Sequence, residues 1–197
     1  MQARRRYDGS VREAAARDLA RAGGENAPLE ILAYDPAWPA AFESERRRLR
    51  PLLPDADICH IGSTAVPGMP AKPVIDVMAL VVDLDGPIAA LTEQAGYEYP
   101  EAFNAVIGHR RWLCRPSAAD RTHHLHLVND RRELDRHLRF RDHLRASQAL
   151  RADYARLKRE LADRFGDDRE AYTEAKAAFI QRVVATDERV ESRPDEG

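Results

Sequence analysis

A glycine-serine turn followed by a buried aspartate contains the residues of this chain whose types and spacing best suit chemistry. An apolar segment runs into Gly62, which lacks a side chain and so permits a tight turn with exposed N–H groups. Ser63, Thr64 and Lys72 then offer donors of the kind that hold phosphate oxygens. Asp76 follows inside an apolar run, where its carboxylate can fix a divalent cation beside the same ligand. The pattern predicts a nucleotide or phosphate site.

A second set of polar side chains lies in the segment Thr122–Val128. Alternation along a strand places His124 and His126 on one face and His123 on the other. If this strand is a neighbour of the Asp76 strand, one carboxylate and two imidazoles form a ligand set for a transition-metal ion or for acid-base catalysis. The alternative is that the histidines are hydrogen-bonded residues lining a cleft and that Asp76 only accepts N–H groups from the turn. Because a buried unpaired charge is costly, we predict a functional carboxylate and assign the three residues as catalytic and metal-binding.

Basic residues in three further segments are candidates for contact with an anion. Arg111 lies in an expected strand and shares a face with Arg115, whereas Arg110 lies on the other face, and the sequence does not decide which set faces the cleft. Arg141 and Lys176 lie within apolar helical stripes, where a cation is unexpected, so each either extends to solvent or reaches a ligand. The predicted phosphate- or nucleotide-binding residues are Gly62, Ser63, Thr64, Lys72, Arg111, Arg141 and Lys176.

Composition restricts the class of protein. The chain has 197 residues, of which 44% are apolar and 32% charged, and this suits one domain with additions. A formal net charge of -2 gives no reason to expect binding to nucleic acid or to a membrane. No apolar run approaches the roughly 18 residues of a membrane span. We expect a cytoplasmic protein in which Cys59 and Cys114 are reduced, buried thiols rather than a disulfide.

The order of patterns along the chain predicts a mixed arrangement of strands and helices. We expect a flexible N-terminal extension over 1–28, a domain over 29–186 and a charged tail over 187–197. Asp35 is predicted to cap a helix whose first residue is Pro36. Strands are expected over 56–61 and 74–82, a helix between 86 and 96, a loop over 100–108, a hairpin of 110–115 with 122–128, and C-terminal helices.

These segments together resemble the GrpB family, a bacterial group similar to the nucleotidyltransferase superfamily. The resemblance implies an α/β (α+β) fold, with a mixed sheet flanked by helices, C-terminal helices, and Gly62-Ser63 as the glycine-serine turn. It also suggests a protein partner in nucleotide or coenzyme A metabolism, because the family is found fused to a coenzyme A biosynthetic kinase domain. The segments that carry the resemblance are Tyr34–Pro39, His60–Gly68, Ala71–Asp76, Thr122–Val128, Phe140–Asp142 and Ala171–Lys176.

One residue departs from the nucleotidyltransferase pattern. That pattern has a second carboxylate two residues after the first, and this chain has Met78 there. A thioether does not replace an oxygen ligand of Mg²⁺, so ordinary two-magnesium transfer is not expected. The sequence favours an unconventional metal-dependent nucleotidyl- or phosphoryl-transfer enzyme with a divalent metal of unknown identity. The alternatives are a non-catalytic nucleotide- or metabolite-binding module and an interaction partner of a nucleotide-using enzyme.

Overall fold

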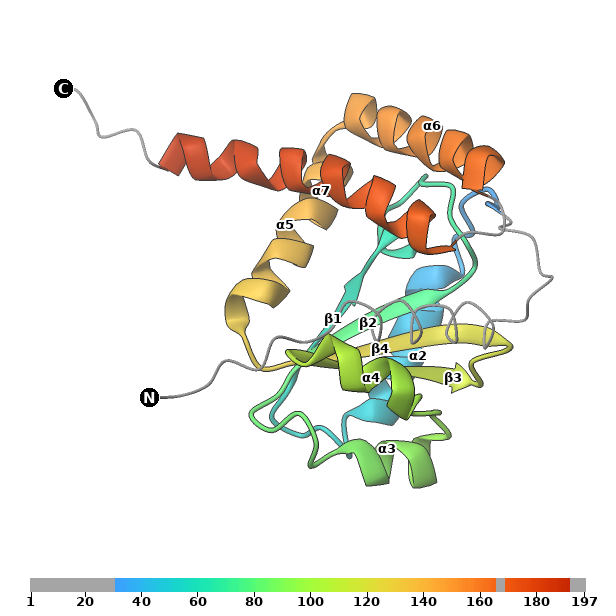
Figure 1. Cartoon of the computed structure of the whole chain (residues 1–197), viewed down its shortest axis with the longest axis vertical. Coiled ribbons are helices and arrows are strands. Elements are labelled where there is room, and N and C mark those ends of the chain that lie inside the picture. Colours follow the sequence, from blue (N-terminus) through green and yellow to red (C-terminus); the bar gives the residue numbers. More distant parts are fainter. Residues whose placement is uncertain (1–30, 166–168, 192–197) are drawn as a thin grey trace.

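A four-stranded mixed sheet forms the centre of the protein, as the computed structural model shows (Figure 1). The described residues are 31–165 and 169–191, so the predicted extension 1–28 and the last part of the predicted tail lie outside them. The strands follow the order β1-β2-β4-β3 across the sheet. They are β1 (Asp57–Ile61), β2 (Ile75–Leu80), β3 (Arg110–Pro116) and β4 (Arg121–Val128).

The pairing of the strands fixes which side chains share a face. β1 is antiparallel to β2, β2 is parallel to β4, and β3 and β4 form the predicted antiparallel hairpin. In this register Asp76 lies opposite His124, and Met78 lies opposite His126. Because opposed residues of neighbouring strands project to the same side, the predicted carboxylate and both predicted imidazoles share one face.

The other face of the sheet carries the main hydrophobic core. Val77 and Leu125 are fully buried there against the helices α2 (Trp38–Leu49) and α3 (Ile88–Ala95). Gly96 ends α3 in the left-handed conformation that its lack of a Cβ atom permits, as predicted. Figure 1 shows α2 behind the sheet in that view, with α3 beyond its lower edge.

The face that carries Asp76 is covered from two sides. The helix α5 (Arg131–Ala146) packs Leu134 against Met78 on one side. The short helix α4 (Glu101–Ile107) packs on the other side, where Trp112 of β3 meets its apolar residues. Asp76 and the histidines of β4 therefore lie between two helices of the same layer.

Two long helices complete the chain and cover the turn after β1. The helix α6 (Gln148–Phe165) and the helix α7 (Arg169–Glu191) pack beside each other and against α5 (Figure 1). Val66 and Met69, both fully buried, come from the segment after the glycine-serine turn and insert among these helices. The C-terminal helices thus pack on the segment that follows the glycine-serine turn.

Three expectations about local structure are corrected. The predicted loop 100–108 contains α4, because Asn104 bonds the carbonyl groups of Pro100 and Trp112 and the N–H of Trp112, which fixes this seven-residue helix on β3. The helix after Asp35 begins at Trp38, since the Asp35 side chain accepts the N–H of Ala37 in a preceding turn. The predicted charged tail is helical as far as the end of α7.

Two further predictions concern the thiols and the membrane. Cys59 lies in β1 and Cys114 in β3, the two edge strands of the sheet, and both are free thiols as expected. Cys114 is buried as predicted, whereas Cys59 is only partly buried. In the part of the chain that the structure describes, no helix is both long enough and apolar enough to cross a membrane.

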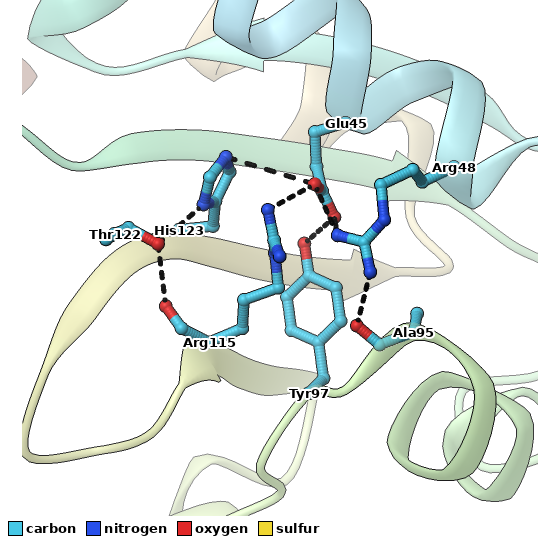
Figure 2. Close-up of polar contacts among 7 residues, drawn as sticks. All are labelled: Glu45, Arg48, Ala95, Tyr97, Arg115, Thr122 and His123. Atoms are coloured by element: carbon cyan, nitrogen blue, oxygen red, sulfur yellow. Dashed lines mark hydrogen bonds and ion pairs between the residues drawn. The ribbon is translucent and has the colours of Figure 1, made fainter.

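A buried polar network ties the core face together (Figure 2). Glu45 of α2 is 1% exposed, and its carboxylate accepts hydrogen bonds from Tyr97 Oη at 2.9 Å, Arg48 Nη1 at 3.0 Å and Arg115 Nη2 at 2.8 Å. His123 Nε2 lies 3.9 Å from the same carboxylate. Each acceptor oxygen of the buried charge has a donor, so this network connects α2 with β3, β4 and the segment after α3.

His60 provides a test of this core, because burial lowers its pKa from 6.5 to about 4. The ring stacks on Phe42 with centroids 4.6 Å apart, and its Nε2 bonds Thr64 Oγ1. Since the folded pKa lies below the unfolded value, the unfolded chain takes up protons first as the pH falls. We expect the contribution of His60 to be complete above pH 6.5 and to decrease by about 3 kcal/mol towards pH 4.

Urea unfolding at several pH values measures this effect. His60→Gln keeps a hydrogen-bonding side chain without a titrating ring, so the free energy of unfolding of this variant should depend less steeply on pH. The matched control is His109→Gln at an exposed position, which should keep the wild-type slope. Equal slopes for His60→Gln and the wild type would show that His60 is not buried in its neutral form.

Candidate functional site

The main chain at Gly62 lies directly against the Asp76 carboxylate. A Cβ atom added to Gly62 would lie 2.3 Å from Asp76 Oδ2, closer than real Cβ contacts, and φ of Gly62 is 71°. Only glycine meets both conditions without strain. The turn then continues as a short 3-10 helix over Ser63–Ala65. The predicted glycine-serine turn and the predicted aspartate are therefore in contact.

Asp76, His124 and His126 form one cluster on the helix-covered face. His124 Nδ1 donates to Asp76 Oδ1 at 2.9 Å, and one ligand atom of each of the three residues lies within 4.8 Å of the others. Ligands of one tetrahedral zinc ion are separated by about 3.3 Å, so small rotations of the rings bring these atoms to a shared ion. The sequence prediction that the three residues converge is confirmed by the register and the distances.

The charge of the cluster suits metal binding. Burial raises the pKa of the Asp76 carboxyl group, but the hydrogen bond from His124 and the neighbouring positive charges outweigh this effect and leave the pKa below its ordinary value. Burial, together with the charge of Arg110, lowers the pKa of His126 well below 6.5. An ionised carboxylate beside a neutral imidazole is the state in which both groups coordinate a metal ion.

Several imidazole nitrogens around the cluster have no hydrogen-bond partner. His124 Nε2, His126 Nδ1 and His137 Nε2 are buried without a partner among the described residues. His137 comes from α5, and burial lowers its pKa to about 4, with Arg136 and Arg110 adding to the effect and Asp76 opposing it. Buried polar atoms normally have partners, so three such atoms near one carboxylate indicate a place for a ligand.

Two lysines, Lys158 buried and Lys176 partly buried, approach the turn from the C-terminal helices. Burial lowers the pKa of Lys176 in α7 to about 8, while the negative charge of Asp76 opposes the shift. Lys158 in α6 is 3% exposed, and its Nζ donates to Ser63 Oγ at 3.1 Å and to the carbonyl oxygen of Pro70. Burial, followed by the charge of Lys176, lowers the pKa of Lys158 to about 7. Two amino groups with lowered pKa values thus lie around the glycine-serine turn.

The remaining predicted residues of the turn have structural contacts. The Thr64 hydroxyl group donates to Val74 O at 3.2 Å and bonds His60, so it stabilises the core side of the turn. Arg141 Nη1 donates to the carbonyl oxygen of His60 at 3.0 Å, and its other nitrogens bind Asp142. Arg141 therefore lies beside the turn and holds the end of β1.

The structure does not bring Arg111 to the cluster. Arg111 pairs with Asp85 at 2.6 Å and lies opposite Leu127, on the core face of the sheet. Arg110, on the other face, is the arginine of this strand whose charge reaches His126. Lys72 is half-buried in the loop before β2, and its carbonyl oxygen accepts the N–H of Val74.

Sequence reasoning missed His137 and Lys158. Lys158 lies one turn from Tyr154 and from Leu161, within an apolar helical stripe, which is the same signal that singled out Lys176. His137 lies one turn from Leu134 and one turn before Arg141 in α5, so spacing alone also placed it on the inward face.

Comparison with known proteins gives a consistent set of matches. A family model described as GrpB protein matches residues 28–186. A UPF0157 protein of Halalkalibacterium halodurans is 35% identical over 164 residues, which cover 81% of this chain and 82% of the relative. The glutamate-rich protein GrpB of Alkalihalophilus pseudofirmus is 27% identical and is covered over 92% of its length, against 78% of this chain. The crystal structure of the conserved protein GrpB from Enterococcus faecalis aligns with a TM-score of 0.69 at 35% identity, covering 80% of this chain and 96% of that one.

Replacement of Gly62 tests the contact between the turn and Asp76. Gly62→Ala introduces a clash with the carboxylate and an unfavourable positive φ, so we expect a loss of stability of about 1–3 kcal/mol and a displaced Asp76 side chain. Gly68→Ala is the matched control, because φ of Gly68 is 77° and an added Cβ atom meets nothing within 4 Å. Thermal unfolding measures the stability, and the chemical shifts of the His124 ring report on Asp76. Only Gly62→Ala should change those shifts, and unchanged shifts in that variant would contradict the contact.

Proposed function

The chain belongs to the GrpB family, and we propose that it binds a divalent transition-metal ion through Asp76, His124 and His126 and transfers a phosphoryl or nucleotidyl group. The observation that carries the proposal is the cluster itself, in which ligand atoms from two neighbouring strands lie within 4.8 Å and two imidazole nitrogens have no partner among the described residues. One carboxylate and two imidazoles suit zinc, manganese or iron better than magnesium. A metal ion at this place supplies Lewis-acid stabilisation of charge on phosphate oxygens.

The surrounding residues support an anionic substrate. The cations Lys176 and Arg110 approach the cluster from α7 and β3, and the negative charge of Asp76 acts on Lys176. Ammonium and guanidinium groups bind phosphate oxygens by charge-assisted hydrogen bonds. In this arrangement Lys176 orients the phosphate, and the Gly62-Ser63 turn positions it beside the proposed metal ligands.

Metal binding is the first test of the proposal. We expect zinc and manganese to bind the wild type and Asp76→Ala, His124→Ala or His126→Ala to lower the affinity by roughly tenfold or more, since each variant removes a ligand. His123→Ala is the matched control, because His123 is on the same strand but faces Glu45 on the other side of the sheet. Calorimetric titration of the metal-free protein measures the affinities. The metal site is refuted if Asp76→Ala and the wild type bind zinc equally.

Nucleotide binding and turnover form the second test. We expect ATP or pyrophosphate to raise the melting temperature more with zinc or manganese than without, and Lys176→Met to remove most of this shift. Arg111→Met is the control, because Arg111 is paired with Asp85 on the other face. Product formation in long incubations with the metal, absent in Asp76→Ala, completes the test. Metal-dependent product in the Asp76→Ala variant would contradict the proposal.

A binding module without catalysis is the second candidate function. Its support is Met78, which is fully buried at the position where the nucleotidyltransferase pattern has its second carboxylate. The incubation separates the two functions, because binding without product favours the module. The absence of both binding and product would favour the predicted interaction with a protein partner in nucleotide or coenzyme A metabolism.

A further inference from the structure

Lys158 makes a contact that the metal site does not require. Its Nζ lies 3.1 Å from Ser63 Oγ and also donates to the carbonyl oxygen of Pro70. Lys158 is 3% exposed, and among the described side chains no carboxylate contributes to its pKa. A buried ammonium without a counter-ion is costly, so the neutral amine is favoured at this place.

The charged groups near Lys158 lower its pKa, whereas the ring of Tyr154 favours the ammonium form. The ring of Tyr154 lies 5.1 Å from Nζ on the same helix, and the positive charges of Lys176 in α7 and Arg159 in α6 are close enough to act on it. Burial and these two charges lower the pKa of Lys158 to about 7. A substantial fraction of the amine is therefore unprotonated near neutral pH and can accept a proton.

Ser63 is the group from which that proton can come. Ser63 is only partly buried, unlike Lys158, and it follows Gly62, whose main chain touches the Asp76 carboxylate. Nζ donates to Ser63 Oγ in the structure, and once the amine is neutral its lone pair can accept the hydroxyl proton over the same distance. A serine hydroxyl group that donates to a neutral buried lysine is activated as a nucleophile.

We propose that Ser63 is a nucleophile towards phosphorus and that Lys158 is its general base, so that the transfer proceeds through a covalent Ser63 intermediate. The substrate class is a phosphoric anhydride, and this part of the inference rests on the proposed function. Ser63 Oγ bonds to phosphorus and its proton passes to Lys158 Nζ. The bond from phosphorus to the bridging oxygen breaks, and the electron pair leaves with the phosphate anion, which needs no proton. Attack by water then releases Oγ, which recovers its proton from Lys158.

A dialkyl fluorophosphate tests the nucleophile without a metal or the natural substrate. The probe reacts with an activated serine, forming an Oγ–P bond and releasing fluoride as the base takes the proton. In the presence of a chelator, we expect intact-mass spectrometry and peptide mapping to find one adduct on Ser63 in the wild type and none in Ser63→Ala. Ser147, whose Oγ accepts the N–H of Leu150 at the start of α6, should remain unlabelled. A folded wild type without an adduct on Ser63 would overturn the proposal.

The rate of labelling separates a general base from a structural contact. In the wild type the rate should increase as Lys158 loses its proton, with a midpoint near pH 7. Lys158→Met and Lys158→Arg should both lower the rate about tenfold or more, because neither residue accepts a proton at this pH. Lys176→Met removes a neighbouring positive charge, so it should move the midpoint to higher pH. A wild-type rate with no midpoint below pH 9, or equal rates in folded Lys158→Arg and wild type, would assign Lys158 a structural role.

These outcomes are independent of the metal site. Labelling of Ser63 in a protein that fails to bind zinc would reject the proposed metal centre and keep the nucleophile. Zinc-dependent turnover that persists in Ser63→Ala, with no adduct in the wild type, would reject the nucleophile and keep the metal centre.

Discussion

The contact between the Gly62 main chain and the Asp76 carboxylate is the constraint on which the site depends. A Cβ atom at position 62 would clash with Asp76 Oδ2, so the turn can pack against β2 only because residue 62 is glycine. Basic side chains of α5 and α6 then hold the rest of the turn by donating hydrogen bonds to main-chain carbonyl groups in and around it. Arg141 binds the carbonyl oxygen of His60, and Arg145 binds that of Ala65 at 2.8 Å. The helices α5 and α6 therefore position the turn as much as the sheet does.

The buried carboxylate on the core face and the buried imidazoles on the other face differ in their hydrogen bonding. On the core face, the carboxylate of Glu45 has a donor for each oxygen, and its network connects α2 to the hairpin (Figure 2). On the other face, His124 and His126 each keep a buried nitrogen without a partner among the described residues. Buried polar atoms with hydrogen-bond partners stabilise the folded state, whereas buried polar atoms without partners destabilise it. This contrast is the physical reason to place function on the Asp76 face.

The sequence was sufficient where local periodicity decides the outcome and insufficient where long-range pairing does. Alternation along β4 placed His124 and His126 together without knowledge of the fold. The same rule separated Arg110 from Arg111, but only the register of β3 against β4 shows that Arg110 shares a face with His126. Lys158 was visible as a cation in an apolar stripe, yet its partner Ser63 is 95 residues away in sequence. The helix α4 was missed because Asn104 stabilises it through contacts with β3 rather than through helix propensity.

The register shows which residue lies beside Met78, the position where the nucleotidyltransferase pattern has its second carboxylate. Met78 lies directly opposite His126, so the level of the sheet that lacks an acid on β2 carries an imidazole on β4. Compared with the nucleotidyltransferase pattern, the possible donor at this level of the sheet is a nitrogen atom rather than an oxygen atom. Imidazole does not serve magnesium well, but it binds zinc and its neighbours in the transition series. A buried methionine beside it excludes water from that side and brings no charge. At the proposed metal site, a methionine on β2 in place of a second acid therefore favours a softer ion than magnesium.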